Sequence, residues 1–118
     1  MTVPIVFFDI AGPAELNLAS FYTKVFGWEA DQTGQFAVAI TPPLRGAFRA
    51  DPGEKRIYLG VADVSATLAA VVEAGGKIDA PRFEVPGVVV LGLFSDPAGN
   101  EMGLVEMIGE RPRVPERG

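Results

Sequence analysis

Two apolar runs separated by a short turn, in the second half of the chain, constrain the fold most strongly. The first run, residues 88–94, leads into the turn sequence at residues 96–100, and the second run, residues 102–107, follows it. Pro97 presets φ for a turn and Gly99 can adopt a positive φ, while the Asp and Asn at the ends of the turn can bond the local backbone. This pattern predicts a β-hairpin.

Composition limits the classes of protein to consider. The chain has 118 residues, 48% hydrophobic and 21% charged, which suits one globular domain with a real core. The net charge of −5 leaves no basic footprint, so we expect no nucleic-acid partner. No run approaches the roughly 20 apolar residues of a membrane span, and the first residues lack the features of a signal peptide. We therefore expect a cytoplasmic protein without a membrane partner.

Histidine and cysteine are both absent from the chain. The absence of cysteine excludes disulfides, thiolate catalysis and sulfur-ligated zinc. The absence of histidine removes the commonest general base and the commonest metal ligand. Any metal would need oxygen ligands alone, which favours magnesium, calcium or manganese. We expect no cofactor.

The first half of the chain reads as a strand, a helix and three further strands. Apolar residues spaced three and four apart between Leu18 and Phe26 predict a helix with one apolar face. This helix is expected to start near Pro13 and to end at Gly27. The predicted strands of this half are residues 3–10, 28–31, 35–41 and 44–50.

The second half repeats this order. Residues 56–61 read as a strand, Asp63 or Ser65 can cap a second helix, and Gly75 with Gly76 stops it. Residues 77–84 read as a strand that Pro81 interrupts, which predicts an edge strand or a bulge. The hairpin then completes a second β-α-β-β-β unit.

The two halves predict one α+β domain at residues 1–108, built from modules at about residues 3–50 and 56–108. Residues 6–10 match residues 57–61 at an offset of 51 positions, and each match precedes a predicted helix. Two copies of one unit imply that neither buries its apolar face well alone. Residues 109–118 are charged and contain two prolines, which predicts a mobile tail.

Strand alternation assigns faces to these side chains. In residues 57–61, Ile57, Leu59 and Val61 form a uniformly apolar set, which should face the helices. Tyr58 and Gly60 form the other set. That mixed set should face the opposite, concave side of the sheet, where a pocket could lie.

Three segments together resemble the vicinal oxygen chelate superfamily, which includes glyoxalases, bleomycin-resistance proteins and ring-cleaving dioxygenases. They are Phe8-Asp9-Ile10 running into FYTKVFGW at residues 21–28, VADV at residues 61–64 before a helix that ends EAGGK, and FSDPAGN at residues 94–100. The resemblance covers most of residues 5–106. It implies two βαβββ modules that form a half-open, barrel-like mixed sheet around a cup, with the helices outside.

The resemblance also locates the superfamily's metal ligands. Three of these positions fall on Phe7, Tyr58 and Gly103, none of which is a good ligand for a catalytic divalent metal. The fourth position lies around residues 47–49 and cannot be aligned securely. The resemblance therefore implies no metal, and we do not expect metal-dependent glyoxalase or dioxygenase activity.

The same positions suggest a ligand site. Phe7, Phe48 and Tyr58 could line an aromatic pocket beside Gly103, since apolar pockets with a few polar groups are the usual small-molecule sites. The alternative is that these rings fill the former metal cup as core packing. Arg45 or Arg49 could hold an anionic ligand group, or could be solvated surface charges.

Two carboxylates are weak catalytic candidates. Asp9 and Glu101 could both face the cup and exchange protons if burial raised the pKa of one of them. The alternative is that Asp9 is an ordinary solvated group near a strand end. Glu106 should point to the other side of the sheet by alternation.

The sequence leaves three functions open. The first is a metal-free protein that binds an apolar or aromatic small molecule in the cup, and the resemblance implies that it acts as a homodimer. The second is a metal-independent isomerase or lyase that uses the cup carboxylates. The third is a structural or interaction protein whose cup is filled.

Overall fold

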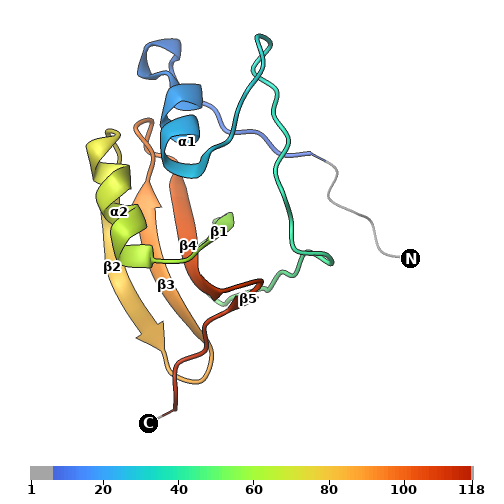
Figure 1. Cartoon of the computed structure of the whole chain (residues 1–118), viewed down its shortest axis with the longest axis vertical. Coiled ribbons are helices and arrows are strands. Elements are labelled where there is room, and N and C mark those ends of the chain that lie inside the picture. The colour runs from blue at the N-terminus through green and yellow to red at the C-terminus, as the bar shows by residue number, and fades with distance from the viewer. Residues whose placement is uncertain (1–6, 118) are drawn as a thin grey trace.

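The computed structural model describes residues 7–117, and it has an α+β architecture (Figure 1). Its elements in chain order are a 3-10 helix η1 (Ala14–Leu16), α1 (Leu18–Phe26), β1 (Tyr58–Val61), α2 (Val64–Glu73), β2 (Lys77–Val85), β3 (Val89–Ser95), β4 (Glu101–Ile108) and β5 (Arg111–Pro112). The strands form one mixed sheet that does not close into a barrel. No helix among residues 7–117 has the length and apolar character needed to cross a membrane.

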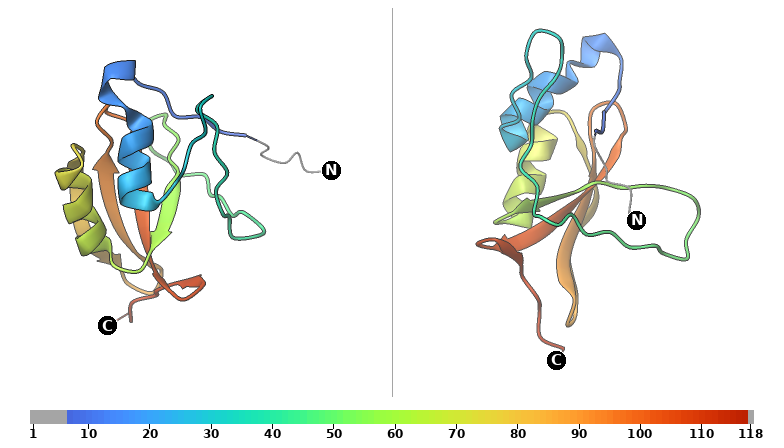
Figure 2. Two further views of the ribbon diagram at one scale, coloured as in Figure 1. Left: turned by 45° about the horizontal axis from the view of Figure 1, so that its top comes forward. Right: turned by 90° about the vertical axis from the view of Figure 1, so that its right-hand side faces the viewer.

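The second half of the chain forms the predicted β-α-β-β-β unit. Its strand order is β1-β4-β3-β2, with β1 parallel to β4 and the other pairs antiparallel. β2 lies at an edge, carries Pro81 and shows register shifts on both sides of Ala80, as the sequence predicts. Both helices cover the same face of this sheet (Figure 2).

The hairpin that constrains the sequence is confirmed as β3 and β4 joined by residues 96–100. The backbone N–H of Asp96 donates to the carbonyl of Asn100 at 2.9 Å. The side-chain Oδ1 of Asp96 accepts from the N–H groups of Ala98 and Asn100, both at 2.9 Å. Gly99 adopts a φ of 89°, a left-handed conformation that favours glycine.

The other oxygen of the same carboxylate reaches the first half of the chain. Oδ2 of Asp96 accepts from the hydroxyl of Tyr22 on α1 at 2.9 Å and from Nδ2 of Asn100 at 2.8 Å. Nδ2 of Asn100 also donates to the carbonyl of Ala11 at 2.9 Å. Burial first, and then the charge of Asp96, raises the pKa of Tyr22 well above its usual range, so the phenol remains a donor.

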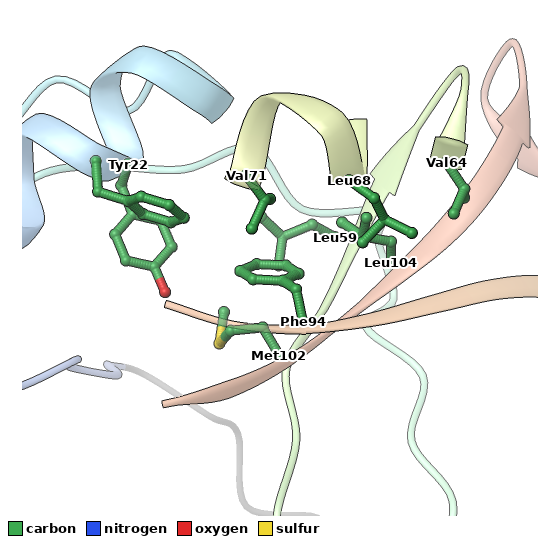
Figure 3. Close-up of a cluster of buried hydrophobic side chains, with 9 residues drawn as sticks. Tyr22, Leu59, Val64, Leu68, Val71, Phe94, Met102 and Leu104 are labelled. Carbon is green, nitrogen blue, oxygen red and sulfur yellow. The ribbon is translucent and has the colours of Figure 1, made fainter. Parts of the chain in front are cut away.

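The hydrophobic core lies between the helices and the sheet. Phe94, Met102 and Leu104 project from β3 and β4 toward Val71 and Leu68 on α2 (Figure 3). A Cβ atom placed on Gly92 would lie 2.5 Å from a methyl carbon of Val64, so β3 and α2 approach closely at this glycine. These contacts hold α2 on the sheet. Phe21 and Tyr22 join the same cluster and hold α1 there as well.

Side-chain caps set the helix boundaries. Oδ1 of Asp63 accepts from the N–H of Ala66 at 2.9 Å, so Asp63 rather than Ser65 caps α2. Gly27 ends α1 with a φ of 72°, as predicted. The α-helix starts later than Pro13, because Asn17 has a left-handed φ of 46° and its side chain accepts from the N–H of Ser20.

The predicted strands of the first half do not form in the described residues. Residues 7–10, 28–31, 35–41 and 44–50 contain no strand, and residues 3–6 lie outside the described residues. Residues 28–57 instead run as a long connection beside the helix–sheet unit (Figures 1 and 2), with a local turn where Asp31 N–H donates to the carbonyl of Gln35 at 2.9 Å. Strands need a partner strand for their backbone groups, and a lone pair of strands is marginal in water.

The carboxy-terminal segment, for which the sequence predicts mobility, makes several contacts. β5 pairs with the end of β4 through Met107 opposite Pro112 and Ile108 opposite Arg111. The carbonyl of Pro115 accepts from the N–H of Gly87 at 2.8 Å. These bonds connect residues 111–115 to the β2–β3 turn and to the end of β4, at the end of the hairpin opposite residues 96–100.

Glu106 lies on the helix side of β4, as alternation predicts. Its carboxylate accepts from the N–H of Val64 at 3.0 Å, from Nη2 of Arg82 at 2.8 Å and from Nε of Arg113 at 3.1 Å. The Arg82 bonds are the main reason that the pKa of Glu106 falls to about 2. One carboxylate thus joins β4, β2, the start of α2 and the carboxy-terminal segment.

Replacing Glu106 by Gln should lower the free energy of unfolding at pH 7 by about 2 kcal/mol, because it removes hydrogen bonds to a charged group. In the unfolded chain the pKa of a Glu is about 4.3. The wild-type contribution should therefore be complete above about pH 4.3 and be lost as the pH falls toward 2. Urea denaturation at several pH values measures this difference. The exposed Glu110→Gln variant should change stability by less than about 0.5 kcal/mol, and an equal loss in both variants would contradict the role of Glu106.

Candidate functional site

The sheet has one face covered by helices and one open face. Because side chains alternate, Tyr58 on β1 and Gly103 on β4 point away from the helices. The pairs Leu91–Val105 and Leu93–Gly103 of β3 and β4 lie on that same open face. Its apolar residues are only partly buried, which distinguishes this face from the core.

Tyr58 lies directly over Gly103. A Cβ atom placed on Gly103 would lie 2.4 Å from Cδ2 and 2.5 Å from Cε2 of the Tyr58 ring. The same relation holds for Gly60, where a Cβ would lie 2.9 Å from Cγ of Met107. The ring therefore occupies the space that a side chain at position 103 would need.

The superfamily's metal does not fit the residues of this chain. Phe7 and Gly103 offer no side-chain donor, and the Tyr58 ring fills the space in which a carboxylate at position 103 would lie. Among residues 7–117, no group of three or more acidic side chains gathers closely enough to hold a metal ion. This donor set supports no reaction step through a metal.

An arginine–carboxylate cluster lies just before β1. Arg49 donates from Nη1 to Asp51 at 2.9 Å and from Nη2 to Glu54. These bonds, with Glu54 contributing most, raise the pKa of Arg49. Arg49, expected to be available for an anionic ligand, is therefore already paired with two carboxylates.

Arg56, which the sequence did not single out, also belongs to this cluster. Its Nη2 donates to Oε1 of Glu54 at 3.1 Å, and only 12% of its side chain is exposed. Its Nε–H is buried and has no acceptor among the described residues. A buried donor without a partner costs about 1–3 kcal/mol. The sequence gives one indication of its place: Arg56 lies two residues before Tyr58, so in an extended strand both side chains point to the same side.

The remaining candidates are dispersed. Phe7, Asp9, Arg45 and Phe48 are exposed and lie outside the sheet. The three atoms nearest to a Cβ placed on Gly103 all belong to the ring of Tyr58. Phe7 and Phe48 are 70% and 108% exposed, so neither ring is packed in the core.

Glu101 lies beside a polar hollow of about 420 Å³ at the turn end of the sheet. Lys77, Asp79 and Ser95 also line it, and Oγ of Ser95 donates to Oδ2 of Asp79 at 2.6 Å. Asp9 is not part of its lining, so the structure does not bring Asp9 and Glu101 together there. The polar lining differs from the aromatic pocket that the sequence predicts.

The sheet, its outer helices and the site positions define a protein of the vicinal oxygen chelate type. Residues 5–105 match the model of the glyoxalase-like domain family. The chain therefore belongs to the glyoxalase-like domain family.

Two mycobacterial proteins are similar to this chain in sequence. They are provisionally named glyoxylase CFP32, from Mycobacterium bovis and Mycobacterium tuberculosis, and are each 30% identical to it over 99 residues. The match covers 71% of this chain but 38% of each relative. The chain thus corresponds to about two fifths of the length of these relatives.

Solved structures support the fold. A glyoxalase-related enzyme from Fulvimarina pelagi matches with a TM-score of 0.58 and 20% identity, over 87% of this chain and 89% of that one. A glyoxalase/bleomycin resistance protein/dioxygenase family enzyme from Burkholderia phytofirmans matches with a TM-score of 0.62 and 11% identity, over 83% and 93%. At these identities the similarity establishes the fold alone.

The contact between Tyr58 and Gly103 can be tested by a double-mutant cycle. Gly103→Ala should lower the free energy of unfolding by about 1–2 kcal/mol, because the new Cβ displaces the ring. The loss should be smaller in a Tyr58→Ala background, where the space is open. Chemical denaturation of the four proteins gives the coupling energy. Equal losses in both backgrounds would show that the ring does not lie over this glycine.

Proposed function

We propose that this protein is a metal-free small-molecule-binding member of the glyoxalase-like family. Its ligand is an apolar or aromatic compound that binds on the open face of the sheet. The observation that carries the proposal is the Tyr58 ring lying over Gly103, at two positions where the family resemblance expects metal ligands. An exchange of metal ligands for a ring converts a metal cup into an apolar surface.

The surroundings of Tyr58 support an apolar ligand. Leu91, Leu93, Val105 and Met107 are partly exposed on the same face. Small-molecule sites are mostly lined by apolar and aromatic side chains with a few polar groups. A flat ligand that covers these side chains would gain about 25 cal/mol for each Å² of apolar surface removed from water.

The metal-independent isomerase or lyase has less support. Glu101 is exposed beside the polar hollow and Asp9 does not line it. A general acid and base must reach one substrate directly or through one water. No observation on the described residues favours this function over ligand binding.

We also propose that the protein works as a homodimer. The edge strand β2 is protected by Pro81 and by Arg82 and Glu84, whereas β1 has no proline and no charged side chain. Ile40, Leu44 and Phe48 are exposed on the long connection. An unprotected edge beside exposed apolar side chains is typical of a surface that another chain covers.

Ligand binding can be tested by thermal shift with benzyl alcohol and indole as neutral aromatic probes. Both should raise the melting temperature, since a ligand of the native state stabilises it by mass action. Tyr58→Ala should weaken binding about tenfold, because it removes the aromatic contact. Val88→Ala, in the exposed β2–β3 turn, should leave the affinity unchanged. Absence of any shift with wild-type protein would favour a structural protein with a filled cup.

The homodimer can be tested by sedimentation velocity over a range of concentrations. The wild-type chain should sediment as a dimer, and Phe48→Glu should shift it toward monomer, because a charge would be buried in the interface. Val72→Glu places the same charge on the exposed side of α2 and should have no effect. A wild-type monomer at every concentration would contradict the proposal.

A further inference from the structure

One carboxylate, that of Glu54, is shared between two arginines near the open face. Oε2 of Glu54 bonds Arg49, and Oε1 accepts from Nη2 of Arg56 at 3.1 Å. The side chains of Arg49 and Glu54 are 44% and 30% exposed, whereas that of Arg56 is 12% exposed. The cluster therefore has one solvated arginine and one largely buried arginine.

The buried arginine is only half paired with this carboxylate. The Nε–H and one Nη group of a guanidinium lie along one edge, and a carboxylate can accept from both at once. Glu54 takes the Nη2 donor of Arg56, while Nε–H has no acceptor among residues 7–117. The oxygen that could complete the pair is held by Arg49 instead.

We propose that Glu54 is an exchangeable carboxylate, and that an aromatic carboxylate bound at Tyr58 displaces it from Arg49. Glu54 then closes on both donors of Arg56. The inference rests on the proposed function, because the aromatic body of the ligand occupies the face at Tyr58. It adds a ligand class, an aromatic ring bearing a carboxylate, and it names Arg49 as the group that binds the carboxylate.

The exchange conserves charged contacts. Arg49 gives up Glu54 and gains the ligand carboxylate, while it keeps Asp51. Arg56 keeps Nη2 paired and gains a partner for Nε–H. The bond that breaks is a solvent-exposed ion pair, a type that contributes little to stability, whereas the new one satisfies a buried donor.

The position of Arg49 suits this role. The N–H of Gly103 donates to the carbonyl of Ile57 at 2.9 Å, so the extended backbone continues before β1 and alternation places Arg56 on the same side as Tyr58. Glu54 joins Arg56 to Arg49, and the ring of Tyr58 faces the open side of the sheet. A ligand stacked on that ring would therefore place a carboxylate near Arg49. Arg45, the other predicted anion-binding residue, has no ion pair among those that the described residues form.

The test compares benzoate with neutral benzyl alcohol by calorimetric titration. Benzoate should bind wild-type protein up to about fivefold more tightly, the range of an exposed ion pair, and Arg49→Gln should abolish this preference. Arg56→Lys keeps a positive charge but lacks the paired donors, so it should lower benzoate affinity and leave benzyl alcohol affinity unchanged. Arg111→Lys on β5 is the matched control and should change neither.

A second pair of variants distinguishes movement of the Glu54 carboxylate from a simple change in the charge near Arg49. Asp51→Asn and Glu54→Gln each remove one negative charge beside Arg49. If Glu54 moves from Arg49 to Arg56 on binding, Asp51→Asn should increase benzoate affinity more than Glu54→Gln does. Only Glu54→Gln removes the carboxylate that would pair with both donors of Arg56. Equal increases would overturn the inference and favour simple electrostatics.

An NMR titration of wild-type protein avoids any folding defect of the variants. The Nε–H signal of Arg56 should move downfield with benzoate and stay in place with benzyl alcohol, because only the carboxylate releases Glu54. An unchanged signal under saturating benzoate would overturn the inference while leaving the proposed function standing. If neither compound binds, the proposed function itself fails, and the inference fails with it.

Discussion

The buried carboxylate of Asp96 connects the two halves of the described chain. One of its oxygens accepts from two backbone N–H groups of the β3–β4 turn, and the other accepts from Tyr22 on α1. Because a buried carboxylate needs several donors, the turn and the helix must be in place together. Phe21 then packs against Phe94, and Tyr22 joins the same buried cluster, which commits one face of the sheet to the core.

The arrangement leaves the other face of the sheet uncovered by helices. The helices cover Phe94, Met102 and Leu104, so alternation places Tyr58 and Gly103 on the open side. The glycine and the tyrosine depend on each other, since the ring occupies the space of a missing side chain. The proposed function uses this ring, at a position where the family resemblance expects a metal ligand, as an apolar contact surface.

Local patterns predicted much of this. The turn at residues 96–100, the Asp63 cap, the bulged edge strand around Pro81 and the opposite faces of Tyr58 and Glu106 all follow from short-range chemistry. The roles of Arg56 and Glu106 could not be predicted, because their partners are far away in the sequence or depend on the path of a loop. The strands predicted between residues 28 and 50 do not form, for a related reason: a strand is stable only where a partner strand is available.

The central claim is that the open face binds ligands without a metal, and isothermal titration with Mn²⁺, Mg²⁺ and Zn²⁺ tests it most directly. Phe7, Tyr58 and Gly103 provide no ligand set, so the account predicts no saturable binding of one ion per chain, with or without benzyl alcohol. Stoichiometric binding of any of these ions with micromolar affinity would contradict it. That result would mean that other oxygen ligands assemble a metal site on this face.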